Sequence, residues 1–232
     1  MCDLHTLAWP VVRLGEALEA LAQHSDLAPR GRESPVPPES LAQDDAEALG
    51  AWIETAAAWL GLEAEPVEAP YAEAEWFVRG AGPSLLRLPG AGVPRFIALL
   101  SGPRRAVSVL GPDLVVHRLC PQAVRAARCR GLETPLPAEV DRLLTEVGVP
   151  GRRRERARQA ILGERLSAER LGGCWLWRLP ASAPCWQQMR QARLPQRLLA
   201  LVGAHAVQYC LWSSPGGWWD KGRSRGASTA AG

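Results

Sequence analysis

An uncharged apolar run near the C-terminal end of the chain, Leu198–Trp212, places the strongest constraint on its fold. The run reads LLALVGAHAVQYCLW, with Arg190, Arg193 and Arg197 before it and a Ser-Ser-Pro-Gly-Gly break after it. A membrane-spanning helix needs roughly 20 apolar residues, so this run is short. Basic residues ahead of an apolar run are typical of a cytoplasmic flank. The pattern therefore leaves two alternatives, a core helix of a soluble domain or an incomplete membrane segment.

Charge divides the chain into an acidic front part and a basic remainder. Residues 1–78 contain fifteen acidic residues and three arginines, whereas residues 79–232 contain nine acidic and twenty-four basic residues. This asymmetry predicts two parts with different surroundings. Of the ten tryptophans, six lie in the last sixty residues. Tryptophan gathers at membrane–water interfaces, so this cluster favours a C-terminal part near a membrane.

The periodicity of apolar residues predicts helices, then short strands, then helices again. Helices are expected over 11–23 and 40–61, with Ser40 capping the second, and residues 63–75 are expected to form a loop. Four antiparallel strands are expected at 85–88, 95–100, 106–110 and 114–119. Beyond them we expect helices over 121–129, 137–147, 151–170 and 184–193, a short extended segment at 175–179, and a disordered tail after Ser213.

Motifs for nucleotides and metals are missing or incomplete. The sequence contains no GxxxxGK[ST] and no GxGxxG after a strand, which excludes the usual phosphate-binding loops. His117, Cys120 and Cys129 follow the spacing H-x2-C-x8-C. A structural zinc site uses four ligands at paired short spacings, so packed thiols are favoured over a metal site. We therefore expect no metal and no cofactor.

Two further patterns in the sequence could indicate chemistry or a charged partner. A thiol enzyme needs a cysteine and a histidine base, and Cys2 and His5 are close in sequence but stand at the chain end, where residues are usually mobile. The arginine block at 152–158 is interpreted as a solvated helix face, with lipid headgroups as the alternative. It lacks the interleaved aromatic residues of nucleic-acid stacking platforms, so no nucleic-acid partner is expected.

Several stretches together resemble the front end of a peptidase-containing ABC exporter. They are RLGEALEAL at 13–21, PRFIALL at 94–100 with AVSVLGP at 106–112, and GCWLWR at 173–178 with LPQRLL at 194–199. Such exporters begin with a papain-like leader-peptidase domain, followed by a linker, six membrane helices and an ATPase. The resemblance implies an α+β, papain-like domain at 8–131 and a helical arginine-rich linker at 132–193. It also implies a truncated first membrane helix at 194–212, followed by the disordered tail at 213–232.

The resemblance also implies that the catalytic positions are vacant. Leu14 stands where the peptidase has its cysteine, Arg95 where it has its histidine, and Gly111 where it has its aspartate. A leucine cannot attack a carbonyl, an arginine stays protonated near neutral pH, and a glycine has no side chain to orient a base. The implied protein is not an enzyme. It is a substrate-recognition or assembly region on the cytoplasmic face of the bacterial plasma membrane.

The implied partners are a peptide or protein substrate and the membrane surface, which would be contacted through Leu198–Trp212 and the neighbouring arginines. Two alternatives remain open. One is a small soluble cytoplasmic binding or scaffold protein in which this run packs into the core. The other is a cysteine-dependent hydrolase that uses Cys2.

Overall fold

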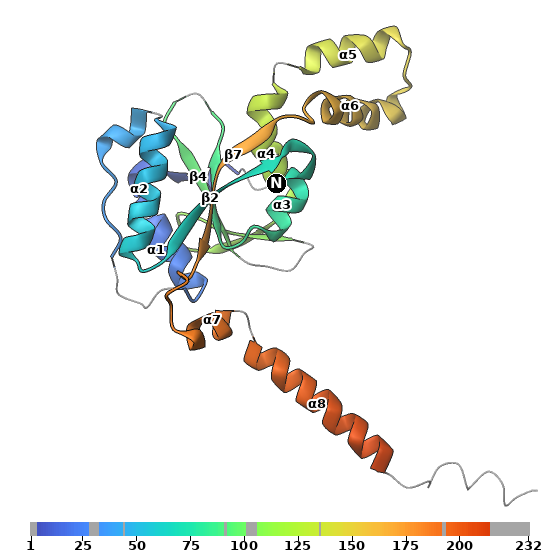
Figure 1. Ribbon diagram of the computed structural model, residues 1–232. Helices are drawn as coiled ribbons and strands as arrows, with labels where there is room; N and C mark the ends of the chain where they lie inside the picture. Colours follow the sequence, from blue (N-terminus) through green and yellow to red (C-terminus); the bar gives the residue numbers. More distant parts are fainter. Residues whose placement is uncertain are drawn as a thin grey trace, which may run out of the picture. The chain divides into compact units, whose positions relative to one another are not determined.

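A seven-stranded antiparallel sheet organises the larger of two compact units, residues 1–182, and residues 183–232 form the second unit. The computed structural model describes residues 4–27, 33–43, 45–90, 92–100, 106–134, 136–191 and 194–213. The strand order is β2-β7-β3-β4-β5-β6, with β1 paired to β4; Figure 1 labels β2, β7 and β4. The predicted α+β class is therefore confirmed, with a larger sheet than the four predicted strands.

The first half of the larger unit contains β1 (Trp9–Pro10), η1 (Val11–Arg13), α1 (Leu14–His24), η2 (Glu39–Gln43), α2 (Ala46–Trp59), β2 (Glu63–Pro70), η3 (Tyr71–Glu73) and α3 (Ala74–Gly80), where η marks a 3-10 helix. The second half contains β3 (Ser84–Leu88), β4 (Arg95–Leu100), β5 (Val107–Leu110), β6 (Val116–Leu119), α4 (Pro121–Glu133), α5 (Pro137–Glu146), α6 (Gly151–Arg165) and β7 (Arg170–Arg178). The second unit contains α7 (Cys185–Gln191) and α8 (Leu194–Ser213).

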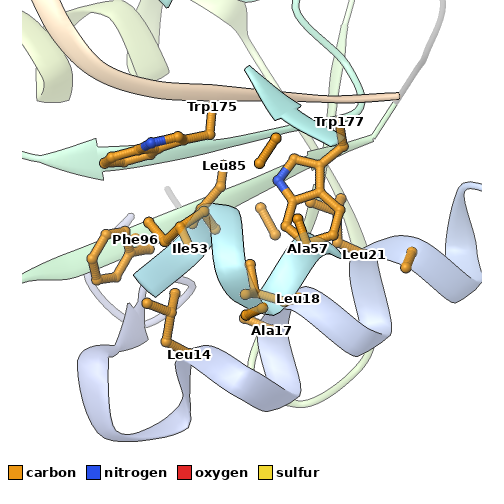
Figure 2. Close-up of a cluster of buried hydrophobic side chains, with 14 of the residues drawn as sticks. Leu14, Ala17, Leu18, Leu21, Ile53, Ala57, Leu85, Phe96, Trp175 and Trp177 are labelled. Carbon is orange, nitrogen blue, oxygen red and sulfur yellow. The ribbon is translucent and has the colours of Figure 1, made fainter. Parts of the chain in front are cut away.

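Side chains that alternate along the central strands bury both faces of the sheet. In β4, Phe96 belongs to the cluster that contains residues of α1 and α2, whereas Ile97 belongs to the cluster that contains residues of α3 and α4. Figure 2 shows the first cluster, in which Leu18 and Ile53 approach the sheet from α1 and α2. Each fully buried leucine or isoleucine of this kind contributes about 1.5–3 kcal/mol through the hydrophobic effect. Burial on both faces fixes the position of β4 in the sheet.

The first two helices follow the predicted pattern, but the start of the second differs. The helix predicted at 11–23 is confirmed as η1 and α1, and α2 ends just before Gly61, whose φ of 78° suits glycine. The predicted cap at Ser40 is wrong. Asp45 caps α2 instead, because its Oδ1 accepts hydrogen bonds from the backbone N–H groups of Glu47 (3.0 Å) and Ala48 (3.2 Å).

The acidic stretch predicted as a loop at 63–75 is instead β2, η3 and the start of α3. β2 pairs with β7 over most of its length, and Pro66 lies opposite Trp175. The two prolines of this stretch are unusual in a β-strand. Proline is compatible with a strand at the edge of a sheet, where its missing N–H would point to solvent. Because β2 is an edge strand, the prolines do not interrupt the ladder.

The extended segment predicted within the linker is a central strand of the sheet. β7 lies between β2 and β3 and pairs antiparallel with both. Cys174, Trp175 and Trp177 of this strand are buried in the core. The compact unit therefore continues to Ser182 and does not end at residue 131 as predicted, because a strand from the presumed linker completes its sheet.

The arginine block lies in α6, which pairs with α5 to form a helical hairpin with its own small core (Figure 1). Arg154 donates to the backbone carbonyl of Asp141 (2.8 Å), and Arg158 binds the Asp141 carboxylate with both Nε and Nη2. These bonds to Arg158 hold the pKa of Asp141 below its usual range. Arg153 and Arg156 are exposed. Part of the arginine block, which was predicted to be a solvated face, therefore holds α6 against α5.

The second unit contains the apolar run, which forms most of α8. Every side chain from Gln196 to Trp212 is exposed, including Leu199 and Leu211. Among the described residues, no helix has the length and apolar character that a membrane-spanning segment needs. The predicted disordered tail lies almost wholly outside the described residues.

Candidate functional site

The N-terminal segment before α1 brings together Leu14, Arg95 and Gly111, the three positions that the resemblance assigns to catalysis. In β1, Pro10 lies opposite Arg95, at the start of β4. The indole Nε1 of Trp9 donates a hydrogen bond of 2.7 Å to the carbonyl of Leu110, which directly precedes Gly111. Leu14 is the first residue of α1, just after this segment. The start of β4 and the end of β5, which are adjacent in the sheet, therefore lie close to the N-terminal end of α1.

The side chains at these positions do not meet one another as a reactive group. Leu14 is fully buried in the cluster that contains Phe96, as Figure 2 shows. Arg95 is exposed, and its Nη1 donates to the backbone carbonyl of His5 at 3.1 Å. Gly111 is buried and offers no side chain. The arrangement thus places no nucleophile at the start of α1.

An open hollow of about 540 Å³ lies beside these positions. Its lining residues come from the N-terminal segment, from the last residue of η1, and from the β5–β6 turn with the strand after it: Thr6, Leu7, Arg13, Pro112, Asp113 and His117. Two of them, Arg13 and Pro112, are direct sequence neighbours of the vacant positions at 14 and 111. The six lining residues include no cysteine and no serine. We take this hollow as the candidate functional site.

An Asp–His pair forms one wall of the hollow. Asp113 Oδ2 lies 3.0 Å from His117 Nε2, and Asp113 Oδ1 accepts a hydrogen bond of 3.1 Å from the backbone N–H of Val115. A Cβ atom added to Gly111 would lie 2.4 Å from Asp113 Oδ1 and 3.3 Å from the His117 ring. The Asp–His pair therefore fills the space that a side chain at position 111 would need.

Arg13 also lines the hollow. Its guanidinium lies over the Trp9 ring, 5.3 Å from the ring centroid. Nε and Nη2 both donate to the Glu16 carboxylate, at 2.9 and 2.7 Å, and Nη2 also donates to the carbonyl of Pro112 at 3.2 Å. Arg13 thus ties the start of α1 to the β5–β6 turn. Its Nε and Nη2 groups are therefore already engaged by acceptors within the protein.

We expect the carboxyl group of Asp113 to titrate below the ordinary aspartate pKa of about 3.9. The hydrogen bond from the N–H of Val115 is the main cause of the lowered pKa, and the contact with His117 adds to it. Since the folded pKa is depressed, the contribution of this group to stability is present above the ordinary pKa and is lost as the pH falls through the folded pKa.

An NMR titration of the side-chain carboxyl carbons measures this pKa, with Asp113→Asn identifying the resonance. A midpoint at or above about 3.9 would contradict the hydrogen-bonded turn.

The other candidate residues do not form a site together. His117 is paired with Asp113, Cys120 is exposed with its Sγ near Gln122, and Cys129 is buried in α4. No group of three metal-binding side chains occurs within the part of the chain that the structure describes. Cys2 lies outside the described residues, and His5 Nε2 is 3.2 Å from Nη1 of Arg130.

Sequence reasoning alone missed most of the hollow. It named His117 as a possible metal ligand and did not name Thr6, Arg13 or Asp113. The one local signal for the hollow is the spacing Asp113-x3-His117 directly after Gly111-Pro112. This spacing lets the two side chains meet. Arg13 and Pro112 are far apart in sequence, so no local pattern could have joined them.

Comparisons with known proteins do not identify this site. No protein-family model, no curated protein and no solved structure matches the chain.

Proposed function

We propose that the chain is the N-terminal, non-catalytic recognition or assembly region of an ABC-type exporter. In this proposal the sheet domain is papain-like and binds a peptide or protein substrate of the exporter without cleaving it. The support comes from the three positions that the resemblance assigns to catalysis. They lie around one N-terminal segment, as a peptidase site requires, yet they carry Leu14, Arg95 and Gly111.

The single observation that carries the proposal is the filled space at Gly111. Peptide hydrolysis by a cysteine peptidase needs a thiolate, a histidine base and a group that orients the base. Here the Asp113–His117 pair occupies the space of a side chain at 111, and Leu14 is buried in apolar packing. Neither position offers a group that could act in hydrolysis, which is expected of a domain that binds and does not cleave.

A peptide-pool experiment tests binding and cleavage at once. The purified chain is incubated with a pool of random twelve-residue peptides, and mass spectrometry is applied to both the bound and the unbound fractions. We expect a subset of peptides to be enriched in the bound fraction with their full length intact. Cleavage products, or a bound fraction identical to the input pool, would contradict the proposal.

A cysteine replacement separates the proposal from the hydrolase alternative. If products appear with the wild-type chain and disappear with Cys2→Ser, a cysteine-dependent hydrolase is supported instead. Cys185→Ser is a matched control, because Cys185 is exposed and lies in the second unit.

We also propose that α8 attaches the chain to the surface of an anionic membrane. Leu198, Leu199 and Val202 are more than half exposed, and no acidic residue occurs in 183–213. A helix with exposed apolar residues and flanking arginines suits the boundary between headgroups and acyl chains. The soluble-scaffold alternative expects no such attachment.

We expect the chain to co-sediment with vesicles that contain phosphatidylglycerol, and to lose this binding when residues 194–232 are deleted. The double variant Leu198→Ser/Leu199→Ser should weaken binding at least about tenfold, since each leucine contributes roughly 1.5–3 kcal/mol on burial. Binding should also fall as salt rises, because the arginines act through the surface potential.

Gln208→Ser is the matched control, as a polar replacement on the same helix that should leave binding unchanged. Equal sedimentation of the full chain with and without vesicles would favour the soluble alternative.

A further inference from the structure

The two edges of the sheet differ in a way that bears on binding. β2 forms one edge and contains two prolines, Pro66 and Pro70, which have no N–H to offer a further strand. Glu63 and Glu65 of the same strand are paired with Arg178. This edge is protected against strand addition. The opposite edge, β6, has the sequence Val-His-Arg-Leu and contains no proline.

The backbone of β6 has groups available for a further strand. The N–H of Gly111 donates to the carbonyl of Val115 at 3.0 Å, which fixes the hydrogen-bonding phase of the β5–β6 ladder. In an antiparallel pair, alternate residues bond to the partner strand, so His117 and Leu119 bond to β5. The N–H and C=O groups of Val116 and Arg118 then point away from β5. Among the described residues, no strand pairs with that side of β6.

The side chains of Val116 and Arg118 lie on one face of the edge, since they are two residues apart. Val116 is 42% exposed, and Arg118 is also exposed. Within the described chain no ion pair involves Arg118, whereas Asp113 is paired with His117 and Glu16 with Arg13. The edge therefore presents an apolar side chain and a cation side by side.

We propose that β6 binds an extended peptide segment by strand addition, which deepens the recognition role proposed above and rests on it. The segment would place an apolar residue opposite Val116 and an aspartate or glutamate, two residues away, opposite Arg118. Cross-strand pairs of this kind, apolar with β-branched and acid with base, are the favourable ones in antiparallel sheets. Main-chain hydrogen bonds supply affinity in this mode, and alternate side chains supply specificity.

A second copy of the chain fits this edge less well than an acidic peptide does. If two β6 strands paired antiparallel about His117, each Arg118 would lie opposite a valine and leave its charge unpaired. Parallel pairing in register would place arginine opposite arginine, which is destabilising. Charge complementarity therefore favours a peptide with the pattern apolar-x-acidic.

The test uses the full chain and the strongest binder from the twelve-residue peptide pool. Arg118→Pro removes one outward N–H while keeping the ladder to β5, because position 118 does not donate to that strand. Arg118→Ala removes the charge and keeps the N–H. We expect Arg118→Pro to weaken binding at least about tenfold, and Arg118→Ala to weaken it less and to reduce the preference for acidic peptides. Unchanged tryptophan near-UV circular dichroism shows that each variant is folded.

Matched peptides provide a second measurement that does not depend on protein variants. N-methylation at alternate residues of the peptide blocks the N–H groups that face β6, and N-methylation at the intervening residues does not. We expect one set to lose binding at least about tenfold and the other to retain it. Equal effects of the two sets, or wild-type affinity of Arg118→Pro, would overturn the inference.

The outcomes also separate this inference from the proposed function. Intact peptides that bind but do not respond to Arg118→Pro leave the recognition role standing and reject the β6 edge. Failure of every peptide in the pool to bind rejects both. A concentration-dependent dimer that Arg118→Pro dissociates would assign the edge to a second copy and would also reject the inference.

Discussion

A fragment that ends at residue 131 is expected to remain unfolded, whereas a fragment of residues 1–182 is expected to unfold in one cooperative transition. The shorter fragment lacks β7, which lies between β2 and β3. Without it β2 has no partner strand, and the face of the sheet under α2 loses Trp175 and Trp177. Removal of a single large aromatic side chain from a core costs roughly 3–5 kcal/mol, so the loss of two exceeds what a marginally stable domain can tolerate.

Far-UV circular dichroism and urea titration of the two fragments measure this difference. A third fragment, residues 1–193, is the matched control, because it adds α7 without changing the sheet. We expect its urea midpoint to equal that of residues 1–182. A cooperative transition in the fragment 1–131 would show that β7 is dispensable and would return the domain boundary to its sequence-predicted place.

The same strand shows what local sequence patterns can and cannot predict. β3 to β6 were predicted within about two residues, because each is a short apolar run bounded by Pro-Gly or Gly-Pro turns. β7 was found as an extended segment but was not assigned to the sheet. Its partner β2 lies about a hundred residues away and is rich in proline and glutamate. Pairing over such a distance leaves no periodic signal in the sequence.

The candidate site, like the sheet, could be predicted from the sequence only in part. The positions of Leu14, Arg95 and Gly111 came from the resemblance, and the structure places all three around the segment that contains β1. The hollow itself depends on contacts between residue 13 and residue 112, which no local pattern encodes. The gap at Gly111 was predicted as a lost catalytic group. The Asp113–His117 pair that lies beside it depends on the geometry of the turn, which no sequence pattern predicts.

Replacement of Arg128 should show how much the contact between α4 and β7 contributes to the free energy of unfolding. Arg128 is 4% exposed and lies in α4, with no acidic partner among its described contacts. Its guanidinium donates to the backbone carbonyls of Leu171 (3.1 Å) and Gly172 (2.8 Å), with a longer contact to Gly173 (3.5 Å). Gly172 and Gly173 lie where the β2–β7 register shifts, so Arg128 donates to carbonyls at an interruption of the ladder.

We expect Arg128→Leu to lower the free energy of unfolding by about 3 kcal/mol, because each buried carbonyl left without a donor costs about 1–3 kcal/mol. The removal of a desolvated charge offsets part of this loss, as burial already lowers the pKa of the guanidinium. Arg130→Leu is the matched control, since Arg130 lies on the same helix but is exposed, and its replacement should change stability by less than about 0.5 kcal/mol.

Urea denaturation of residues 1–182, followed by tryptophan fluorescence, measures both changes. Hydrogen exchange should additionally localise the loss to β2 and β7, since these strands share the register shift that Arg128 supports. Equal stability of Arg128→Leu and wild type would mean that apolar packing replaces the carbonyl bonds. In that case the junction between α4 and β7 would depend on burial of Cys174 and its neighbours, and not on the guanidinium.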